Sequence, residues 1–189
     1  MTQPTESKVR GWAALAVVAY GAVVVALTML KTYFVIGLLW RPESQRGRSV
    51  EWVPFAQLGD AQTWFGPVFD ALGNLAFFVP LGVLLYILLE GRARAVLVVV
   101  TGAAISATVE VLQYVLALGH SDVTDLLFNT AGALVGALIA RACGPRLHPL
   151  WIGLALTTAA VFAVLVVLGP RLGDPAAVVE LGTDRPPAR

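Results

Sequence analysis

The chain has 189 residues, a formal net charge of +1, 58% hydrophobic residues and only 13% charged residues. Soluble domains are nearer half apolar and a quarter charged, so this composition excludes an ordinary soluble protein, and the length suits one domain. The near-neutral charge offers no basic field to a nucleic-acid partner. A single cysteine, Cys143, excludes an internal disulfide, and no Cys/His cluster has metal-ligand spacing, so we expect neither a metal nor a cofactor.

Five apolar segments are long enough to cross a membrane, which takes about 20 mostly apolar residues. They cover residues 12–30, 68–89, 95–118, 122–140 and 151–168. After the first segment, Lys31 interrupts an apolar run that continues to residue 40, which indicates one long tilted helix or a span with an interfacial extension. A cleaved signal peptide is the alternative, but the run exceeds the ~7–15 apolar residues of a signal core.

The connections between these segments are predicted to be short, apart from a polar and irregular stretch at residues 41–67. We expect tight turns at residues 90–94 and 119–121 and a short loop at residues 141–149. The sequence therefore predicts an all-α fold, a polytopic transmembrane helix bundle of about five spans. We divide the chain into an N-terminal segment (1–10), a transmembrane domain (11–170) and a disordered tail rich in proline, glycine and charge (171–189).

Lysine and arginine are unevenly distributed between the two ends of the predicted bundle. One end collects Lys8, Arg10, Arg92, Arg94, Arg141 and Arg146. At the other end, the arginines of residues 41–48 are mixed with acidic residues in a longer loop. Because basic residues in short loops favour the cytoplasmic side, we expect a cytoplasmic N-terminus and an outer end that is less basic.

Seven polar residues, here called the polar cluster, fall near the outer ends of three predicted helices. They are Asp70, Asn74, Glu110, Gln113, Asp122, Asp125 and Asn129. Spacings of three and four residues place the members from each helix on one face of that helix. An ionised carboxylate in hydrocarbon costs at least ~2.5–3.5 kcal/mol, so Glu110 must face protein or a water-filled cleft, be protonated or have a partner.

The side-chain amides of the polar cluster, those of Asn74, Gln113 and Asn129, can donate hydrogen bonds to the oxygens of Glu110. Such a cluster holds a proton, binds a cation, or binds a cationic or hydroxylated ligand. A structural alternative stands beside this for two of the residues. Asp122 can be the N-cap of the fourth helix, with Asp125 in its first turn, because both positions favour acidic residues.

Other residues have simpler interpretations. Asn129 can serve as a hydrogen bond between helices, and Gly132 and Gly136 form a notch for helix packing. Pro80 removes a hydrogen bond within the second span and is expected to kink it, with Gly82 beside it. His120 lies at the outer end beside Asp122, where a pH-sensitive accessory role is an alternative to a plain turn position.

Two stretches of the sequence resemble the VanZ-like family of bacterial membrane proteins. The first is "NLAFFVPLG", from Asn74 to Gly82, which is similar to the pattern N-x-x-x-F-x-P-x-G. The second runs from Glu110 to Gly136 and matches E-x-x-Q followed by D-x-x-D-x-x-x-N-x-x-G-x-x-x-G. The proline and aromatic residue of "VPF", Val53–Phe55, also resemble a pair found in this family. The resemblance covers about residues 50–140.

The resemblance implies a multi-pass protein of the bacterial cytoplasmic membrane that is associated with resistance to the glycopeptide teicoplanin. It supplies no reaction. One position departs from the family pattern, which usually has an arginine three residues before the first aspartate of the second stretch. Here that residue is Gly119, so the carboxylates lack a cationic partner at this place in the sequence.

Four functions are compatible with these observations. The first is a membrane protein of the cell envelope whose outward-facing acidic cleft engages a lipid-linked precursor or a lipophilic glycopeptide. The second is a membrane-embedded enzyme that uses paired carboxylates as acid and base on an envelope lipid or sugar. The third is a transporter or proton relay, which the absence of an inverted repeat disfavours. The fourth is a structural partner of other envelope proteins. Membrane lipids are expected partners in every case, and the oligomeric state is open.

Overall fold

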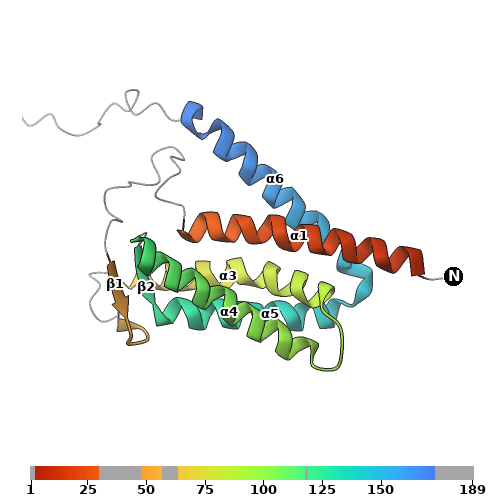
Figure 1. Ribbon diagram of the computed structural model, residues 1–189, viewed down its shortest axis with the longest axis horizontal. Coiled ribbons are helices and arrows are strands. Elements are labelled where there is room, and N and C mark those ends of the chain that lie inside the picture. The colour runs from red at the N-terminus through yellow and green to blue at the C-terminus, as the bar shows by residue number, and fades with distance from the viewer. Residues whose placement is uncertain (1–2, 30–47, 57–63, 118, 173–189) are drawn as a thin grey trace, which may run out of the picture.

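The computed structural model describes residues 3–29, 48–56, 64–117 and 119–172. Within these residues the chain forms five long helices and a pair of short strands (Figure 1). Each of the five helices is long and apolar enough to cross a membrane. The helices are α1 Gln3–Met29, α3 Phe65–Leu88, α4 Arg94–Leu116, α5 Val123–Cys143 and α6 His148–Leu172, with a short 3-10 helix, η2 Pro145–Leu147, before α6. The predicted fold class, a polytopic helix bundle of five spans, is confirmed.

The ends of the helices differ from the predicted spans by a few residues. The largest difference is at the N-terminus, where α1 begins at Gln3, so most of the segment predicted to precede the first span forms the first turns of that span's helix. The extension expected at residues 31–40 lies outside the described residues, as does the tail from residue 173 onward. α3 is continuous through Pro80.

The centre of the bundle is the close contact between α3 and α5. A Cβ atom on Gly132 would collide with the carbonyl oxygen of Leu75, and one on Gly136 would collide with the backbone of Val79 and Val83. Gly82 of α3 is equally tight against the backbone of α5. Because these positions lack side chains, the two backbones approach each other closely, which is how small residues stabilise helix pairs in a membrane.

The remaining helices pack around this pair. α4 lies against α5, while α1 contacts both α3 and α6 (Figure 1). The apolar core between them contains fully buried side chains from α1, α3 and α4: Val24, Phe78, Leu81, Val83, Leu84 and Val98. α6 is the least buried of the five spans, because only 11% of its most apolar segment is buried inside the protein. It diverges from the bundle toward its C-terminal end (Figure 1).

A small parallel sheet closes one end of the bundle. Its strands are β1 Arg48–Glu51 and β2 Gly119–Asp122, paired so that Arg48 is opposite Gly119 and Glu51 is opposite Asp122. The prediction of irregular chain and a tight turn at these places was wrong. Parallel strands need a long crossover connection, and here the connection runs through α3 and α4, which cross the bundle and return. The sheet therefore lies beside the N-terminal ends of α3 and α5 (Figure 1).

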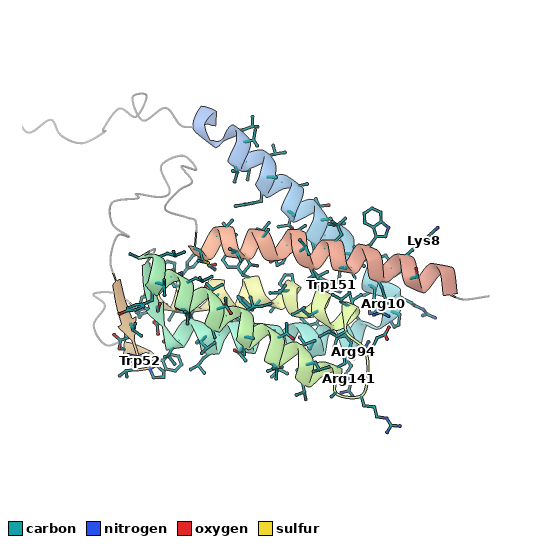
Figure 2. All side chains as sticks on the ribbon, in the orientation of Figure 1. Lys8, Arg10, Trp52, Arg94, Arg141 and Trp151 are labelled. Carbon is teal, nitrogen blue, oxygen red and sulfur yellow. The ribbon has the colours of Figure 1, made fainter. Side chains whose placement is uncertain are left out.

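The opposite end of the bundle carries basic residues. Figure 2 shows Lys8, Arg10, Arg94 and Arg141 gathered there, far from Trp52 at the end with the sheet. The turn between α3 and α4 contains Gly91 with a φ of 97°, a backbone conformation that side chains rarely adopt. The two ends of the bundle thus differ in charge as the sequence predicts. The cytoplasmic placement of the basic end remains a prediction.

Candidate functional site

The end of the bundle that carries the sheet also holds the whole polar cluster. Asp70 and Asn74 lie in the first turns of α3, Asp122, Asp125 and Asn129 lie at the start of α5, and Glu110 and Gln113 lie near the end of α4. The cluster is divided, however, because its side chains point to different neighbours. The side chains fall into three groups. One connects α4 to β2 by hydrogen bonds, the second lines a groove with carboxylates, and the third consists of two amides buried between helices.

Glu110 connects α4 to β2 through two hydrogen bonds. Its Oε2 accepts a hydrogen bond from the backbone N–H of Asp122 (3.0 Å). Its backbone carbonyl oxygen accepts a second hydrogen bond from the Oγ of Ser121 (2.7 Å). The carboxylate thus satisfies a backbone donor at the end of β2, which explains how an acidic side chain is accommodated at the end of a membrane helix.

Asp122 is the N-cap of α5. Its backbone is extended, and its Oδ1 accepts a hydrogen bond from the backbone N–H of Thr124 (2.7 Å). Asp125 follows in the first turn of the helix. Glu110, Asp122 and Asp125 are thus gathered around the start of α5. Both aspartates lie at the N-terminal end of α5, where the positive end of the helix dipole interacts favourably with acidic side chains.

A groove of about 100 Å³ lies between the N-terminal ends of α3 and α5. Three carboxylates line it, those of Asp70, Asp122 and Asp125, together with Thr124. The rest of its wall is apolar and aromatic: Phe55, Pro67, Val68, Ala71, Leu72 and Phe128. Acidic groups and apolar walls in one groove suit an amphiphilic ligand with hydroxyl or cationic groups on one part and an apolar surface on another.

Phe55 forms the side of the groove that does not come from a helix. It has a φ of 64°, which is unusual for a residue with a side chain. Its backbone N–H donates to the Oγ1 of Thr124 (3.0 Å), and its ring packs edge-on against Phe128 (6.1 Å between centroids). Strained backbone persists only where neighbours hold it, and here one hydrogen bond and one ring contact with α5 do so.

Gln113 and Asn129 are not part of the groove. The Nε2 of Gln113 donates to the carbonyl oxygen of Thr28 on α1 (3.0 Å), and the Nδ2 of Asn129 donates to the Oγ of Ser106 on α4 (2.9 Å). Both residues are buried, and within the described part of the chain their amide oxygens have no hydrogen-bond partner. These two amides, which the sequence allows to donate to Glu110, each donate to a neighbouring helix instead.

The other predicted residues lie at the same end of the bundle, outside the lining of the groove. Asn74 is half-buried on α3, one turn after Asp70. His120 lies in β2, where its backbone is paired with Ser49, and its side chain is outside what the structure describes. Gly119, which departs from the family pattern, is paired in register with Arg48. A basic residue of the other strand thus lies opposite the position where the family usually has an arginine.

Sequence reasoning missed the aromatic and hydroxyl residues of the groove. Phe128 follows Asp125 by three residues, a spacing that places two side chains on the same face of a helix, so that signal was present. Phe55 was noted in the sequence only as part of the family-like "VPF" stretch and was not placed at the site, and Thr124 had no comparable signal. Among the described residues, no three His, Cys, Asp or Glu side chains are placed to hold a metal ion.

Comparison with known proteins supports the resemblance seen in the sequence. The model of the family described as VanZ/LLP1 matches residues 17–144. Protein VanZ of Enterococcus faecium is 29% identical over 94 residues, which cover 47% of this chain and 50% of that protein. The match thus spans half the length of this curated relative. No solved structure shows significant similarity to the chain. The family match extends from within α1 to the end of α5 and includes every residue of the polar cluster, so the chain belongs to the VanZ/LLP1 family.

Proposed function

We propose that this membrane protein acts in the bacterial cell envelope, in the cytoplasmic membrane, and that its acidic groove engages an envelope ligand. The ligand is a lipid-linked precursor or a lipophilic glycopeptide, and the phenotype is resistance of the teicoplanin type. The observation that carries the proposal is the groove itself, where Asp70, Asp122 and Asp125 share one cavity with apolar and aromatic walls.

The chemistry of the groove fits ligands of this kind. Carboxylate oxygens accept hydrogen bonds from sugar hydroxyls, amides and ammonium groups. The rings of Phe55 and Phe128 and the side chains of Val68 and Leu72 offer apolar surface beside them. A lipid-linked saccharide and a lipophilic glycopeptide both present hydroxyl or amine groups next to an apolar chain. With the basic end in the cytoplasm, the groove faces the outer leaflet, where such ligands are accessible.

Asp70 and Asp125 both line the groove, so replacing them tests its acidic character. The carboxylates of Glu110 and Asp122 both accept hydrogen bonds from backbone N–H groups. Replacing either residue therefore alters the fold around the groove as well as the charge of the groove. We expect the double variant Asp70→Asn, Asp125→Asn to lose teicoplanin resistance when it replaces the native protein in a deletion strain. Glu90→Gln, which removes a carboxylate at the opposite end of the bundle, is the matched control and should keep resistance.

Membrane levels of each variant are measured on the same cells, so that a loss of protein is not mistaken for a loss of function. Full resistance of the double variant at normal membrane levels would contradict the proposal. Loss of resistance in both the double variant and Glu90→Gln would also count against it, because the effect would then follow charge or folding rather than the groove.

An enzymatic function is the second candidate. The observation that favours it is the position of Glu110, which accepts a hydrogen bond from the N-cap residue of α5, while Asp125 lies in the first turn of that helix. Two such carboxylates can act as acid and base on a lipid or sugar. Lipid analysis of a deletion strain distinguishes the two functions: an enzyme predicts an accumulated substrate or a missing product, whereas ligand binding alone predicts neither.

A purely structural role has less support. Gly132 and Gly136 were candidates for packing against another envelope protein, but in this chain the backbone of α3 fills the space beside both of them. The glycine notch is thus used within the bundle.

A further inference from the structure

The end of the bundle opposite the groove has a large excess of positive charge. The start of α1, the end of α3, the start of α4, the end of α5 and the start of α6 meet there (Figure 1). These helix ends and the turns between them contain two acidic residues, Glu6 and Glu90. They contain six basic residues: Lys8, Arg10, Arg92, Arg94, Arg141 and Arg146. Figure 2 shows four of the six at this end.

Ion pairs between the described side chains neutralise little of this charge. Arg10 and Glu90 form a salt bridge of 2.9 Å, and both side chains are more than half exposed. No other ion pair is present among the described side chains of this end. Lys8, Arg92 and Arg141 are exposed. The basic end therefore keeps most of its charge available to an anionic partner.

Arg94 differs from the other basic residues because its position is fixed. Its guanidinium lies 3.8 Å from the centre of the buried Tyr86 ring, and the residue is only half-exposed. It is also close enough to His148 for their charges to interact, so it lies where α3, α4 and α6 meet. A guanidinium stacked on a ring keeps its N–H edge free to donate, and that edge matches the oxygens of a phosphate.

The surroundings favour a lipid phosphate over a soluble one. The membrane-crossing segments begin or end here, at Ser7, Leu88, Arg94 and Cys143, so the basic side chains lie at the depth of lipid headgroups. Large apolar side chains are exposed beside them: Val96 and Leu97 on α4, and Leu147 and Leu150 next to the start of α6. Clusters of basic side chains at the ends of transmembrane helices are typical sites for anionic lipids.

We propose that the basic end of the bundle binds the phosphate headgroup of an anionic phospholipid, with Arg94 as the fixed donor and Arg92 and Arg141 as supporting charges. The acyl chains then lie along the exposed apolar side chains of α4 and α6. This site is separate from the acidic groove, which lies at the other end of the helices, and it does not depend on the function proposed for that groove.

Lipid binding to the purified full-length chain in detergent micelles tests the proposal. The probes are phosphatidylglycerol, phosphatidylcholine and inorganic phosphate, and native mass spectrometry measures the bound lipid. We expect phosphatidylglycerol to be retained at much lower concentrations than phosphatidylcholine, and inorganic phosphate at equal concentration not to displace it. Arg94→Gln should weaken retention about fivefold, and the triple change Arg92→Gln, Arg94→Gln, Arg141→Gln about a hundredfold.

Two further variants make the test specific. Glu90→Gln removes the carboxylate that pairs with Arg10, so it should bind phosphatidylglycerol as tightly as the native chain or more tightly. The double change Arg92→Gln, Arg141→Gln affects only exposed side chains and keeps the test decisive if loss of Arg94 disturbs folding; it should weaken retention more than tenfold. Equal retention of the two lipids, full displacement by inorganic phosphate, or native retention by the triple variant would each overturn the proposal.

Discussion

The side chain of Glu110, near the end of α4, accepts a hydrogen bond from the backbone N–H of Asp122, the residue that caps α5 (3.0 Å). One carboxylate thus fixes the position of the next one. Asp122 in turn accepts from Thr124, and Thr124 accepts from the backbone of Phe55. This chain of hydrogen bonds runs from α4 through β2 and the start of α5 to the far wall of the groove, and it gives Glu110 a positioning role.

Replacing Glu110 should therefore reduce stability. We expect Glu110→Ala to lower the free energy of unfolding by about 1–3 kcal/mol, because the N–H of Asp122 is left without its acceptor in a part-buried site. Glu110→Gln keeps an acceptor oxygen and should lose less. Unfolding in mixed micelles measures the difference. Thr108→Val is the control, since Thr108 is exposed and bonds only to its own helix. An Ala variant as stable as the native chain would refute the positioning role.

Thr124→Val should make the segment around Phe55, which forms one wall of the groove, less firmly bound to α5. Valine has nearly the shape of threonine but no hydroxyl oxygen, so the N–H of Phe55 loses its partner while the packing is kept. We expect hydrogen exchange at the amide of Phe55 to accelerate about fivefold, the factor for ~1 kcal/mol. Thr130→Val is the matched control in the same helix, because the Oγ1 of Thr130 bonds to the carbonyl of Leu126. Equal exchange in both variants would show that the hydrogen bond does not hold the wall.

Gly136→Ala should weaken the contact between α3 and α5. The added methyl group would collide with the backbone of Val79 and Val83, atoms that cannot move without shifting α3. Overpacking of this kind costs about 1–3 kcal/mol. The control is Gly73→Ala, since no atom lies within 4 Å of the Cβ it would add, and alanine favours a helix. In thermal unfolding, the Tm of Gly136→Ala should lie below that of the native chain, and the Tm of Gly73→Ala should lie above it. A Gly136→Ala variant with the native Tm would contradict the close packing.

Gln113→Leu should loosen α1 without affecting the groove. Gln113 donates to Thr28 near the end of α1, and Met29 packs there beside Val109 of α4. In a Cys143→Ser background, we expect disulfide formation between Met29→Cys and Val109→Cys to fall when Gln113 is replaced. Teicoplanin resistance should persist, because Gln113 lies outside the groove. Loss of resistance with unchanged cross-linking would show that Gln113 contributes to ligand binding rather than to the packing of α1.

The five spans could be predicted because lipid imposes a constraint that is visible along the sequence. A helix in a membrane must be apolar over about 20 residues regardless of its neighbours, so length and composition locate it. The same reasoning placed the polar cluster at one end, since each short connection reverses the direction of the chain.

The division of the polar cluster could not be predicted in this way. Glu110 and Gln113 are three residues apart and lie on neighbouring parts of the same helix face. α4, however, contacts β2 on one side and α1 on the other, so the two side chains meet different partners. Spacing gives the face of a helix but not which neighbour covers each part of it. The strands were missed for a similar reason, because a strand of four mostly polar residues has no periodic signal and its partner is far away in sequence.

The pairing of β1 with β2 also determines the order in which the protein is completed. Arg48 and Gly119 are neighbours in the sheet, yet α3 and α4 lie between them in the chain. During synthesis β1 emerges first and has no partner until both helices have been inserted and the chain has returned to the same side. Closing so long a connection is slow compared with local helix formation. The wall formed by Phe55 and the walls formed by α5 therefore come together only after α3 and α4 have crossed the bundle.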